Sequence, residues 1–314
     1  MVVSKCLEFA PCRYNGVMVS DEFVRRMKGH VTFCAVCPEV EIGLGCPRET
    51  IRVVQVNGRP RLLQPATSRD LTEAMQTFAA TFLGVLGETD GFILKSRSPS
   101  CGIKDVKVYG GPHHDMPQGV GTGFFGGAVL ERFPLAAVED EGRLRNFTIR
   151  EHFLTRMYTQ MAFRRIGAAG AVKDLVRFQQ DNKWLLMAYN QTEMRAMGAI
   201  VANRKGETPA AMFEAYGRRL AHALAKPPRF TSIINVLMHA LGYVSEGLTA
   251  PEKAFFLDTL EKYRAGAVPL SVATALLKSW GLRFQAPYLL EQTFLEPYPE
   301  ALVEITDSGK GREG

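Results

Sequence analysis

Residues 31–39 read Val-Thr-Phe-Cys-Ala-Val-Cys-Pro-Glu, a short β-branched run that ends at Cys37 and a proline turn. This pattern is typical of a buried strand followed at once by a loop. Similar runs lie at residues 2–4, 51–56, 91–95 and 106–109. Between them, residues 70–86 carry apolar side chains at helical spacing, which indicates a helix that crosses between parallel strands. We therefore expect an α/β domain with a mostly parallel, open sheet over residues 1–138.

The second half of the chain has a different pattern. Strand signals fade after residue 150, and long amphipathic stretches bounded by Gly, Pro or Asn take over. They lie at residues 151–166, 173–189, 209–225, 231–246 and 251–264. We expect an all-α domain over residues 151–306. The acidic stretch at 139–142 predicts a linker over residues 139–150, and the polar end of the chain predicts a disordered tail over residues 307–314.

Composition limits the class of protein. With 314 residues, of which 46% are hydrophobic and 22% charged, the chain is long and apolar enough to pack two domains. No apolar run approaches the roughly 20 residues that span a bilayer, and the first six residues are too short for a signal peptide. We expect a soluble, cytoplasmic protein without a membrane partner. A net charge of +6 is compatible with a phosphate-rich partner.

All six cysteines lie at or before residue 101, which in a cytosolic chain favours metal binding or reactive thiols over disulfides. Three of them, Cys6, Cys37 and Cys101, follow predicted strands. Because the carboxyl ends of parallel strands share one edge of a sheet, these three thiols should converge. They suggest a zinc site or an iron–sulfur cluster with one open coordination position. The alternative is three buried, inert thiols.

The other cysteines leave the ligand count open. Cys12 and Cys46 lie on predicted loops, where either is near enough to be a fourth ligand or a resolving thiol. Cys34 alternates with Val36 on the strand and is expected to point into the core. Basic residues near the three strand ends, such as Lys95, should favour thiolate over thiol.

A glycine-rich segment, Gly119-Val-Gly-Thr-Gly-Phe-Phe-Gly-Gly127, opens a predicted short helix and contains the spacing of a dinucleotide fingerprint. Because residues 110–118 read as a loop rather than a strand, we do not expect a nicotinamide site. Gly121 and Gly123 stay candidates for contact with a nucleotide phosphate, beside the simpler reading as a turn. Basic residues of the second half either bind an RNA backbone or form solvated helix faces. They are residues 164–165, 204–205, 218–219, 226 and 229.

Three motifs of the first half carry a family resemblance: Ser4-Lys-Cys-Leu7 with Cys12-Arg-Tyr-Asn-Gly16, Cys37-Pro-Glu-Val-Glu-Ile-Gly-Leu-Gly45 with Pro47-Arg48, and Leu94-Lys-Ser-Arg-Ser-Pro-Ser-Cys-Gly102. Together they resemble the thiouracil desulfidase family over roughly the first 135 residues. The second half is similar to the helical domain of the two-domain, 4-thiouridine desulfidase form. The motifs there are Asn182-Lys-Trp-Leu-Leu-Met-Ala188, His239-Ala-Leu-Gly-Tyr243 and Tyr263-Arg-Ala-Gly-Ala-Val-Pro-Leu270.

The resemblance implies a cofactor and a reaction. A [4Fe-4S] cluster would be held by Cys6, Cys37 and Cys101, and its fourth iron would take the thiocarbonyl sulfur. Water would then convert 4-thiouridine to uridine and hydrosulfide without net redox chemistry. A catalytic carboxylate falls on Glu39, which would act as the general base toward water. A catalytic serine falls on Ser98 or Ser100, of which we favour Ser100.

The resemblance also implies a nucleic-acid substrate, most of all transfer RNA, because a free base would need no basic second domain. Arg13, Tyr14 and Phe124 are the candidates to stack on the unstacked base, and Lys95, Gly121 and Gly123 would complete the substrate contacts. Three alternatives stay open: desulfuration of free thiouracil or thiouridine nucleotides in salvage, a non-catalytic metal-bound RNA-binding module, and a thiol redox enzyme. The sequence indicates nothing about protein partners.

Overall fold

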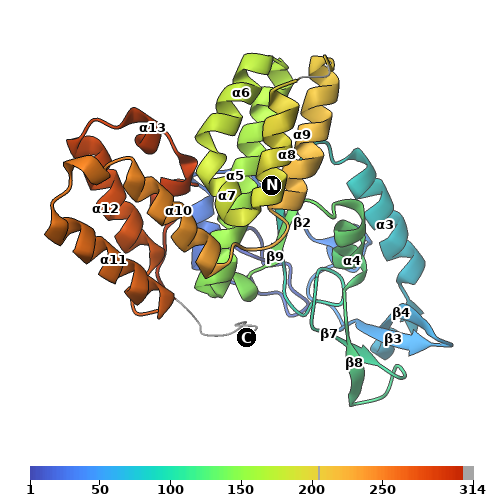
Figure 1. Ribbon diagram of the computed structural model, residues 1–314. Coiled ribbons are helices and arrows are strands. Elements are labelled where there is room, and N and C mark those ends of the chain that lie inside the picture. The colour runs from blue at the N-terminus through green and yellow to red at the C-terminus, as the bar shows by residue number, and fades with distance from the viewer. Residues whose placement is uncertain (204–205, 307–314) are drawn as a thin grey trace. The chain divides into compact units, whose positions relative to one another are not determined.

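The computed structural model describes residues 1–203 and 206–306 (Figure 1). The chain divides into two compact units, one of residues 1–153 together with the segment that begins at Leu302, and one of residues 154–301. The first unit is α/β and the second is helical, which confirms the predicted fold class. The basic pair at 204–205 and the tail predicted at 307–314 lie outside the described residues. No described helix has the length and hydropathy needed to cross a membrane.

A four-stranded parallel sheet forms the centre of the first unit. Its strands are β1 (Val2–Ser4), β2 (Cys34–Val36), β6 (Gly91–Leu94) and β9 (Ala137–Asp140), in the order β2-β1-β6-β9. β1 pairs in parallel with both β2 and β6, so these three strands end at the same edge. All residues of β1 and β6 are buried, and Ser4 is the one polar side chain in these two strands, as expected for a parallel sheet covered on both faces. Cys34, expected in the core, is exposed instead.

The acidic segment around residue 140 is part of this unit. Residues 137–140 form β9 at the edge of the parallel sheet, and Asp140 and Glu141 are both buried. Asn146 then accepts a hydrogen bond from the backbone N–H of Ile149 at 3.0 Å, near the start of α5 (Phe147–Ala169). The residues predicted as a linker therefore contribute to a sheet and to a helix start.

A second sheet departs from the prediction of one parallel sheet. It contains β3 (Arg52–Val56), β4 (Arg59–Gln64), β5 (Arg69–Asp70), β7 (Val106–Tyr109) and β8 (Pro117–Gly121), in the order β5-β4-β3-β7-β8. All its pairings are antiparallel except that of β3 with β7. The run at 51–56 thus belongs to a different sheet, because a turn at Asn57-Gly58 folds it onto β4. Residues 117–118, predicted as loop, belong to β8, where Pro117 pairs with Tyr109 of β7 and Gln118 lies at a register shift.

Helices cover the apolar faces of the first unit. α3 (Thr72–Val85) and α4 (Phe124–Arg132) lie side by side in Figure 1, and α3 confirms the helix predicted at 70–86. The rings of Phe78, Phe82 and Phe125 meet between them with centroids 5.6–6.0 Å apart. Two shorter helices, α1 (Glu22–Met27) and α2 (Pro38–Glu41), follow the first two strand-end loops.

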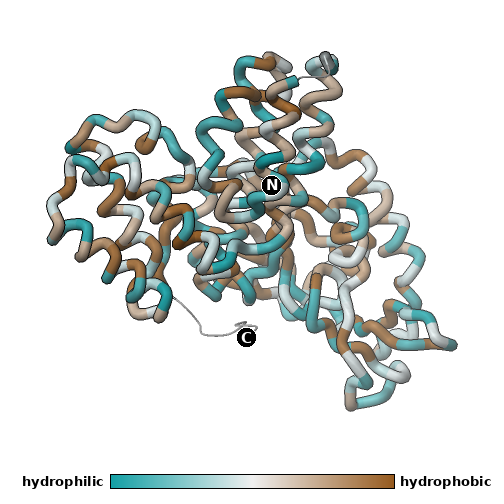
Figure 2. The backbone as a smooth tube through the Cα atoms, viewed as in Figure 1, coloured by the Kyte–Doolittle hydropathy of each residue, from teal (hydrophilic) through white to brown (hydrophobic). Residues whose placement is uncertain are grey.

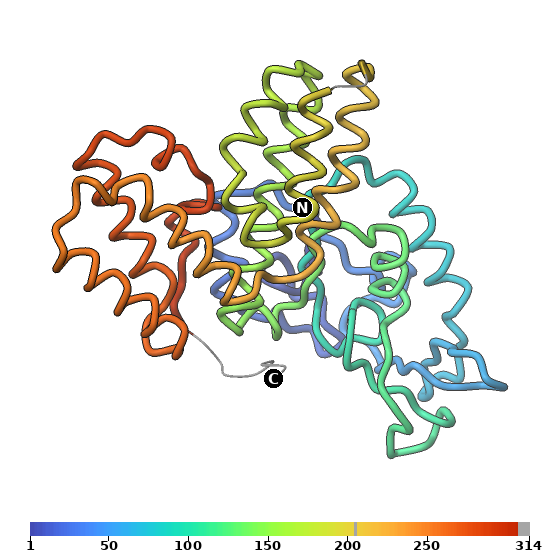
Figure 3. The backbone as a smooth tube through the Cα atoms, in the orientation of Figure 1, coloured from blue at the N-terminus to red at the C-terminus, as the bar shows by residue number. Residues whose placement is uncertain are grey.

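The second unit is built from helices whose apolar and polar residues alternate, as the brown and teal segments of Figure 2 show. They are α6 (Val172–Asp181), α7 (Lys183–Tyr189), α8 (Gln191–Val201), α9 (Pro209–Ala223), α10 (Phe230–Gly242), α11 (Ala250–Arg264), α12 (Leu270–Arg283) and α13 (Pro287–Leu290). α8 and α9 lie side by side (Figure 3). The helix predicted at 173–189 is broken at Asn182, whose side chain donates to the carbonyl oxygen of Phe178.

Candidate active site

Three cysteines from separate strand ends surround one cavity of about 370 Å³. Cys6 follows β1, Cys37 follows β2 and caps α2, and Cys101 lies in the loop after β6. All three are buried, with 5–8% of each residue exposed. The sequence prediction that these thiols converge is therefore confirmed.

Burial dominates the acid–base behaviour of these thiols. It raises the pKa of Cys6 far above the usual range, and the neighbouring thiols Cys101, Cys12 and Cys37 raise it further. Burial likewise raises the pKa of Cys101 to about 12. Lys95 lowers the pKa of Cys6, which is the predicted direction, but by less than burial raises it. A bound cation would be needed to hold these sulfurs as thiolates.

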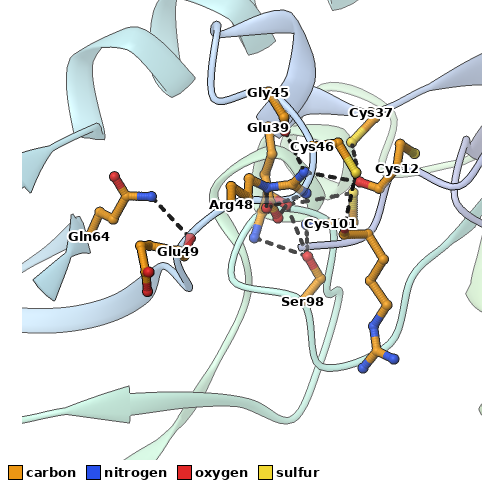
Figure 4. A network of polar contacts seen from close by, with 12 residues as sticks. Cys12, Cys37, Glu39, Gly45, Cys46, Arg48, Glu49, Gln64, Ser98 and Cys101 are labelled. Atoms are coloured by element: carbon orange, nitrogen blue, oxygen red, sulfur yellow. Dashed lines mark hydrogen bonds and ion pairs between the residues drawn. The ribbon is translucent and has the colours of Figure 1, made fainter. Parts of the chain in front are cut away.

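A carboxylate stands beside the thiols. Glu39 is the second residue of α2, directly after the proline that starts this helix, and only 9% of it is exposed. The hydroxyl of Ser100 donates to its Oε1 at 2.6 Å. Arg48 donates to its Oε2 through Nε at 2.8 Å and lies 2.7 Å from the same oxygen through Nη2. Each carboxylate oxygen therefore has its own partner, and Figure 4 shows the Arg48 guanidinium beside Glu39.

Sequence reasoning assigned no role to Arg48. Its side chain is 4% exposed, and its Nη1 donates to the carbonyl oxygens of Cys12 at 3.0 Å and Gly45 at 2.9 Å. The guanidinium thus fixes Glu39 and two loops of the cavity at once. The only sequence signal was its place in the Pro47-Arg48 motif, nine residues beyond its partner.

The two candidate serines have different surroundings. Ser100 is 1% exposed and faces Glu39. The hydroxyl oxygen of Ser98 accepts from the backbone N–H of Cys101 at 3.1 Å and lies 2.9 Å from the hydroxyl of Ser100. Ser98 therefore shapes the turn that carries Cys101, whereas Ser100 contacts the carboxylate.

The glycine-rich segment supports this turn from behind. The backbone N–H groups of Phe124, Phe125 and Gly126, at the start of α4, donate to the carbonyl oxygens of Pro99 and Ser100 at 2.9–3.1 Å. A Cβ on Gly123 would lie 2.5 Å from the carbonyl oxygen of Ser100. Gly121 and Gly123 do not line the cavity, and their contact with a nucleotide phosphate stays a prediction. The first N–H groups of this helix already have carbonyl partners.

Three of the other predicted substrate contacts line the cavity. Arg13, Tyr14 and Lys95 belong to its wall, whereas Phe124 does not. The Arg13 guanidinium lies 5.2 Å from the centre of the Tyr14 ring, and 40% of Tyr14 is exposed. Lys95 is ion-paired with Glu141, whose Oε2 also accepts from the backbone N–H of Ser96 at 2.7 Å. Sequence reasoning missed Glu141 because it lies in the presumed linker.

Cys12 and Cys46, the two candidates for a fourth ligand or a resolving thiol, differ in burial and position. Cys12 is buried and lines the cavity, and its carbonyl oxygen accepts from the Cys37 thiol at 3.8 Å. Cys46 is exposed, does not line the cavity and contacts the carbonyl oxygens of Pro11 and Arg13 at 3.1 and 3.2 Å. Within residues 1–203 and 206–306, no three His, Cys, Asp or Glu side chains are close enough together to share a single metal ion.

Comparisons with known proteins match both parts of the chain. The sequence profile of the family described as 2-thiouracil desulfurase matches residues 1–141, and that of a protein family of unknown function, DUF1722, matches residues 183–299. YbbK of Bacillus subtilis (strain 168), named as an uncharacterized protein, is 33% identical over 110 residues, which cover 32% of this chain and 72% of YbbK. A solved structure of the [4Fe-4S]-dependent thiouracil desulfidase TudS is 27% identical with a TM-score of 0.37, covering 46% of this chain and 91% of that one.

Proposed function

The chain belongs to the 2-thiouracil desulfurase family, with a DUF1722 domain after the desulfurase domain, and from this premise we propose that it is an iron–sulfur desulfidase that converts 4-thiouridine to uridine, most of all in transfer RNA. The reaction exchanges a thiocarbonyl sulfur for the oxygen of water and releases hydrogen sulfide, so no electrons are gained or lost. One observation carries the proposal. Glu39, held between Ser100 and Arg48, opens on the same cavity as three buried cysteines.

The donor set fits a [4Fe-4S] cluster held by Cys6, Cys37 and Cys101. Three thiols from three strand ends line one cavity and are protected from water, as such a cluster requires. A cluster spreads its ligands over several irons, so its thiolates need not crowd around one ion. When bound, a cluster with three cysteine ligands supplies one iron with a free position, which can bind sulfur and polarise its bond to carbon.

The chain's own residues would handle the protons. Arg48 keeps Oε2 of Glu39 occupied and so directs Oε1 toward Ser100 and the cavity. A carboxylate in this position can take a proton from water directly or through the Ser100 hydroxyl, and can return it to the ring nitrogen or the leaving sulfur. Because the Ser100 hydroxyl already donates to Oε1 at 2.6 Å, this transfer needs no rearrangement of the two side chains.

The rim of the cavity suits a pyrimidine joined to a sugar phosphate. Tyr14 offers a partly exposed ring for stacking, with Arg13 beside it, and Lys5 and Arg97 add positive charge to the wall. The net charge of +6 also favours a polyanionic substrate. In the helical unit, however, Arg218 and Arg219 are ion-paired with Glu214 and Glu193, which lowers the charge they offer to RNA.

The proposal is tested by comparing three substrates: transfer RNA that contains 4-thiouridine, the free 4-thiouridine nucleotide, and 2-thiouracil. Loss of the near-ultraviolet absorbance of the thiocarbonyl and release of sulfide are followed anaerobically. We expect the highest kcat/KM on transfer RNA. Turnover confined to the free nucleotide or base would assign the enzyme to salvage, and turnover of none would end the desulfidase proposal.

Glu39→Gln provides the matched variant, because it keeps the size of the side chain and removes its basicity. We expect it to lose roughly 100-fold or more in kcat while keeping its iron content. The control is Glu41→Gln, an exposed residue of the same short helix. A non-catalytic RNA-binding protein would show no turnover to lose.

A further inference from the structure

A second buried ion pair reaches the cavity, and the desulfidase proposal does not use it. Lys95, directly after β6, is paired with Glu141, directly after β9. The side chain of Lys95 is 19% exposed and that of Glu141 is 6% exposed. An ion pair of the helical unit, Lys278 with Glu296, has side chains 45% and 49% exposed. Burying two charges is costly in free energy, so the position of the Lys95–Glu141 pair calls for a reason.

The Glu141 carboxylate is fixed by Ser96 as well as by Lys95. Its Oε2 accepts from the backbone N–H of Ser96 at 2.7 Å. Its Oε1 accepts from the Ser96 hydroxyl at 2.7 Å and from the Lys95 ammonium. Lys95 and Ser96 line the cavity, whereas Glu141 does not. Glu141 can therefore act on the cavity through these two residues of its wall.

The Lys95 ammonium has an acceptor for each of its three N–H groups. They are Oε1 of Glu141, the hydroxyl oxygen of Ser96 at 3.0 Å and the carbonyl oxygen of Ser96 at 3.2 Å. The backbone N–H of Lys95 donates to the hydroxyl of Ser4 at 2.9 Å, so the chain at the base of this side chain is fixed as well. Lys95 thus offers the cavity a fixed positive charge rather than a free hydrogen-bond donor.

This charge belongs to the same wall as the thiols. β1 and β6 pair in parallel, so Lys95 lies beside the residues that lead from β1 to Cys6. Lys95 and Cys6 both line the cavity. In the proposed reaction, the sulfur leaves this cavity as hydrosulfide, a small anion. A cation in a partly buried wall attracts an anion more strongly than a cation surrounded by water does, because the local dielectric constant is lower.

We propose that Glu141 is a positioning residue that holds the Lys95 ammonium in the cavity wall, where its charge stabilises the leaving hydrosulfide. This inference rests on the proposed function in one respect, namely that hydrosulfide is the leaving group. Arg97 of the same wall is exposed and can turn toward water. Lys95 cannot do so without leaving Glu141 buried and unpaired, which is costly. The carboxylate therefore keeps the ammonium in place while the anion enters and leaves.

The test measures hydrosulfide binding without turnover. Full-length, cluster-loaded protein is titrated anaerobically with sodium sulfide, at a fixed pH where hydrosulfide is the main form, and binding is followed by the visible absorbance of the protein. The double variant Lys95→Met/Glu141→Gln removes the ion pair without leaving a buried unpaired charge. We expect it to bind hydrosulfide roughly 10-fold more weakly than wild type, because the ammonium is the member of the pair that lines the cavity.

Glu141→Gln alone separates positioning from net charge. If the net charge near the cavity were all that mattered, loss of this carboxylate would strengthen the binding of an anion. We expect weaker binding instead, by about 3-fold or more, because the Lys95 ammonium is no longer held in the wall. Stronger hydrosulfide binding by Glu141→Gln would overturn the positioning role.

Lys278→Met/Glu296→Gln is the matched control, because it removes an exposed ion pair of the helical unit. It should bind hydrosulfide as wild type does, and thermal melting and iron content should show all variants folded and loaded. Equal affinity of Lys95→Met/Glu141→Gln and wild type would overturn the inference, as would a fully loaded wild type that binds no hydrosulfide. Because no thiolated substrate is present, failure of the desulfidase proposal is read from the turnover assay instead.

Discussion

Arg48 and Glu39 form a buried ion pair in which two guanidinium nitrogens, Nε and Nη2, lie 2.8 and 2.7 Å from the same carboxylate oxygen. The other oxygen of Glu39 is thereby left for Ser100. This arrangement places the Glu39 carboxylate in the wall of the cavity that the three buried cysteines line. Removing either charge would leave the other buried and unpaired, which is costly.

Arg48→Lys is expected to lower kcat roughly 10-fold or more while iron content is kept. Lysine preserves the charge but cannot reach Glu39 and the carbonyl oxygens of Cys12 and Gly45 at once. Arg52→Lys is the control, because Arg52 also binds a carbonyl oxygen, that of His114, but lies outside the cavity. An unchanged kcat in Arg48→Lys would show that the ion pair does not position Glu39.

Substitutions of Ser98 and Ser100 should have different effects on kcat and on iron content. Ser100→Ala removes the hydroxyl that contacts Glu39, and we expect kcat to fall roughly 100-fold with little loss of iron. Ser98→Ala removes the acceptor for the Cys101 N–H, and we expect about 1 kcal/mol lower stability together with faster loss of the cluster. Steady-state kinetics and iron content of both variants distinguish these effects. The reverse pattern would assign the catalytic hydroxyl to Ser98.

Gly123 tests whether α4 supports the cysteine turn. A methyl group there would lie 2.5 and 2.7 Å from the carbonyl oxygens of Ser100 and Ser98, so Gly123→Ala must displace the turn. We expect a stability loss of about 2 kcal/mol or more and reduced iron binding. Gly84→Ala, in open space near the end of α3, should instead raise stability by up to about 1 kcal/mol. Full iron loading of a folded Gly123→Ala protein would contradict this role.

The raised pKa of Asp140 predicts that the free energy of unfolding depends on pH. Burial, helped by Glu141 and Glu139, raises the pKa of this carboxyl to about 6 from an ordinary value of 3.8. The folded state therefore holds this proton more tightly than the unfolded state, and the associated stability is lost as pH rises through 6. Asp140→Asn should gain about 1 kcal/mol over wild type between pH 5 and pH 8. Denaturant titrations at pH 5 and pH 8 measure this gain in the free energy of unfolding. A gain that shrinks with rising pH would contradict a raised pKa at Asp140.

The sequence correctly predicted that Cys6, Cys37 and Cys101 converge. Residues directly after parallel strands meet at one sheet edge, and this does not depend on the rest of the fold. It could not predict the second sheet. The pattern of residues 51–56 marks a strand but does not say which neighbour it pairs with, and β8 is rich in glycine and proline, which read as loop. Residues Cys34–Val36 form an edge strand of the parallel sheet, so alternation with Val36 did not bury Cys34.

The polar contacts of the site were harder to foresee than its thiols. Arg48 reaches Glu39 across a loop, and Glu141 reaches Lys95 from the turn directly after β9, in the segment predicted as a linker. Neither pairing follows a fixed spacing in sequence. Gly121 and Gly123 matched a phosphate-binding spacing, but the N–H groups that such a site needs are bonded to the turn at Pro99 and Ser100.

Iron and acid-labile sulfide, measured in anaerobically reconstituted protein, test the central claim most directly. The wild type should contain about four of each per chain, and Cys101→Ala should lose them. Cys46→Ala, which changes an exposed thiol outside the cavity, should keep both. Zinc in place of iron, or an iron content that is the same in Cys101→Ala as in the wild type, would contradict the cluster and the chemistry proposed for this site.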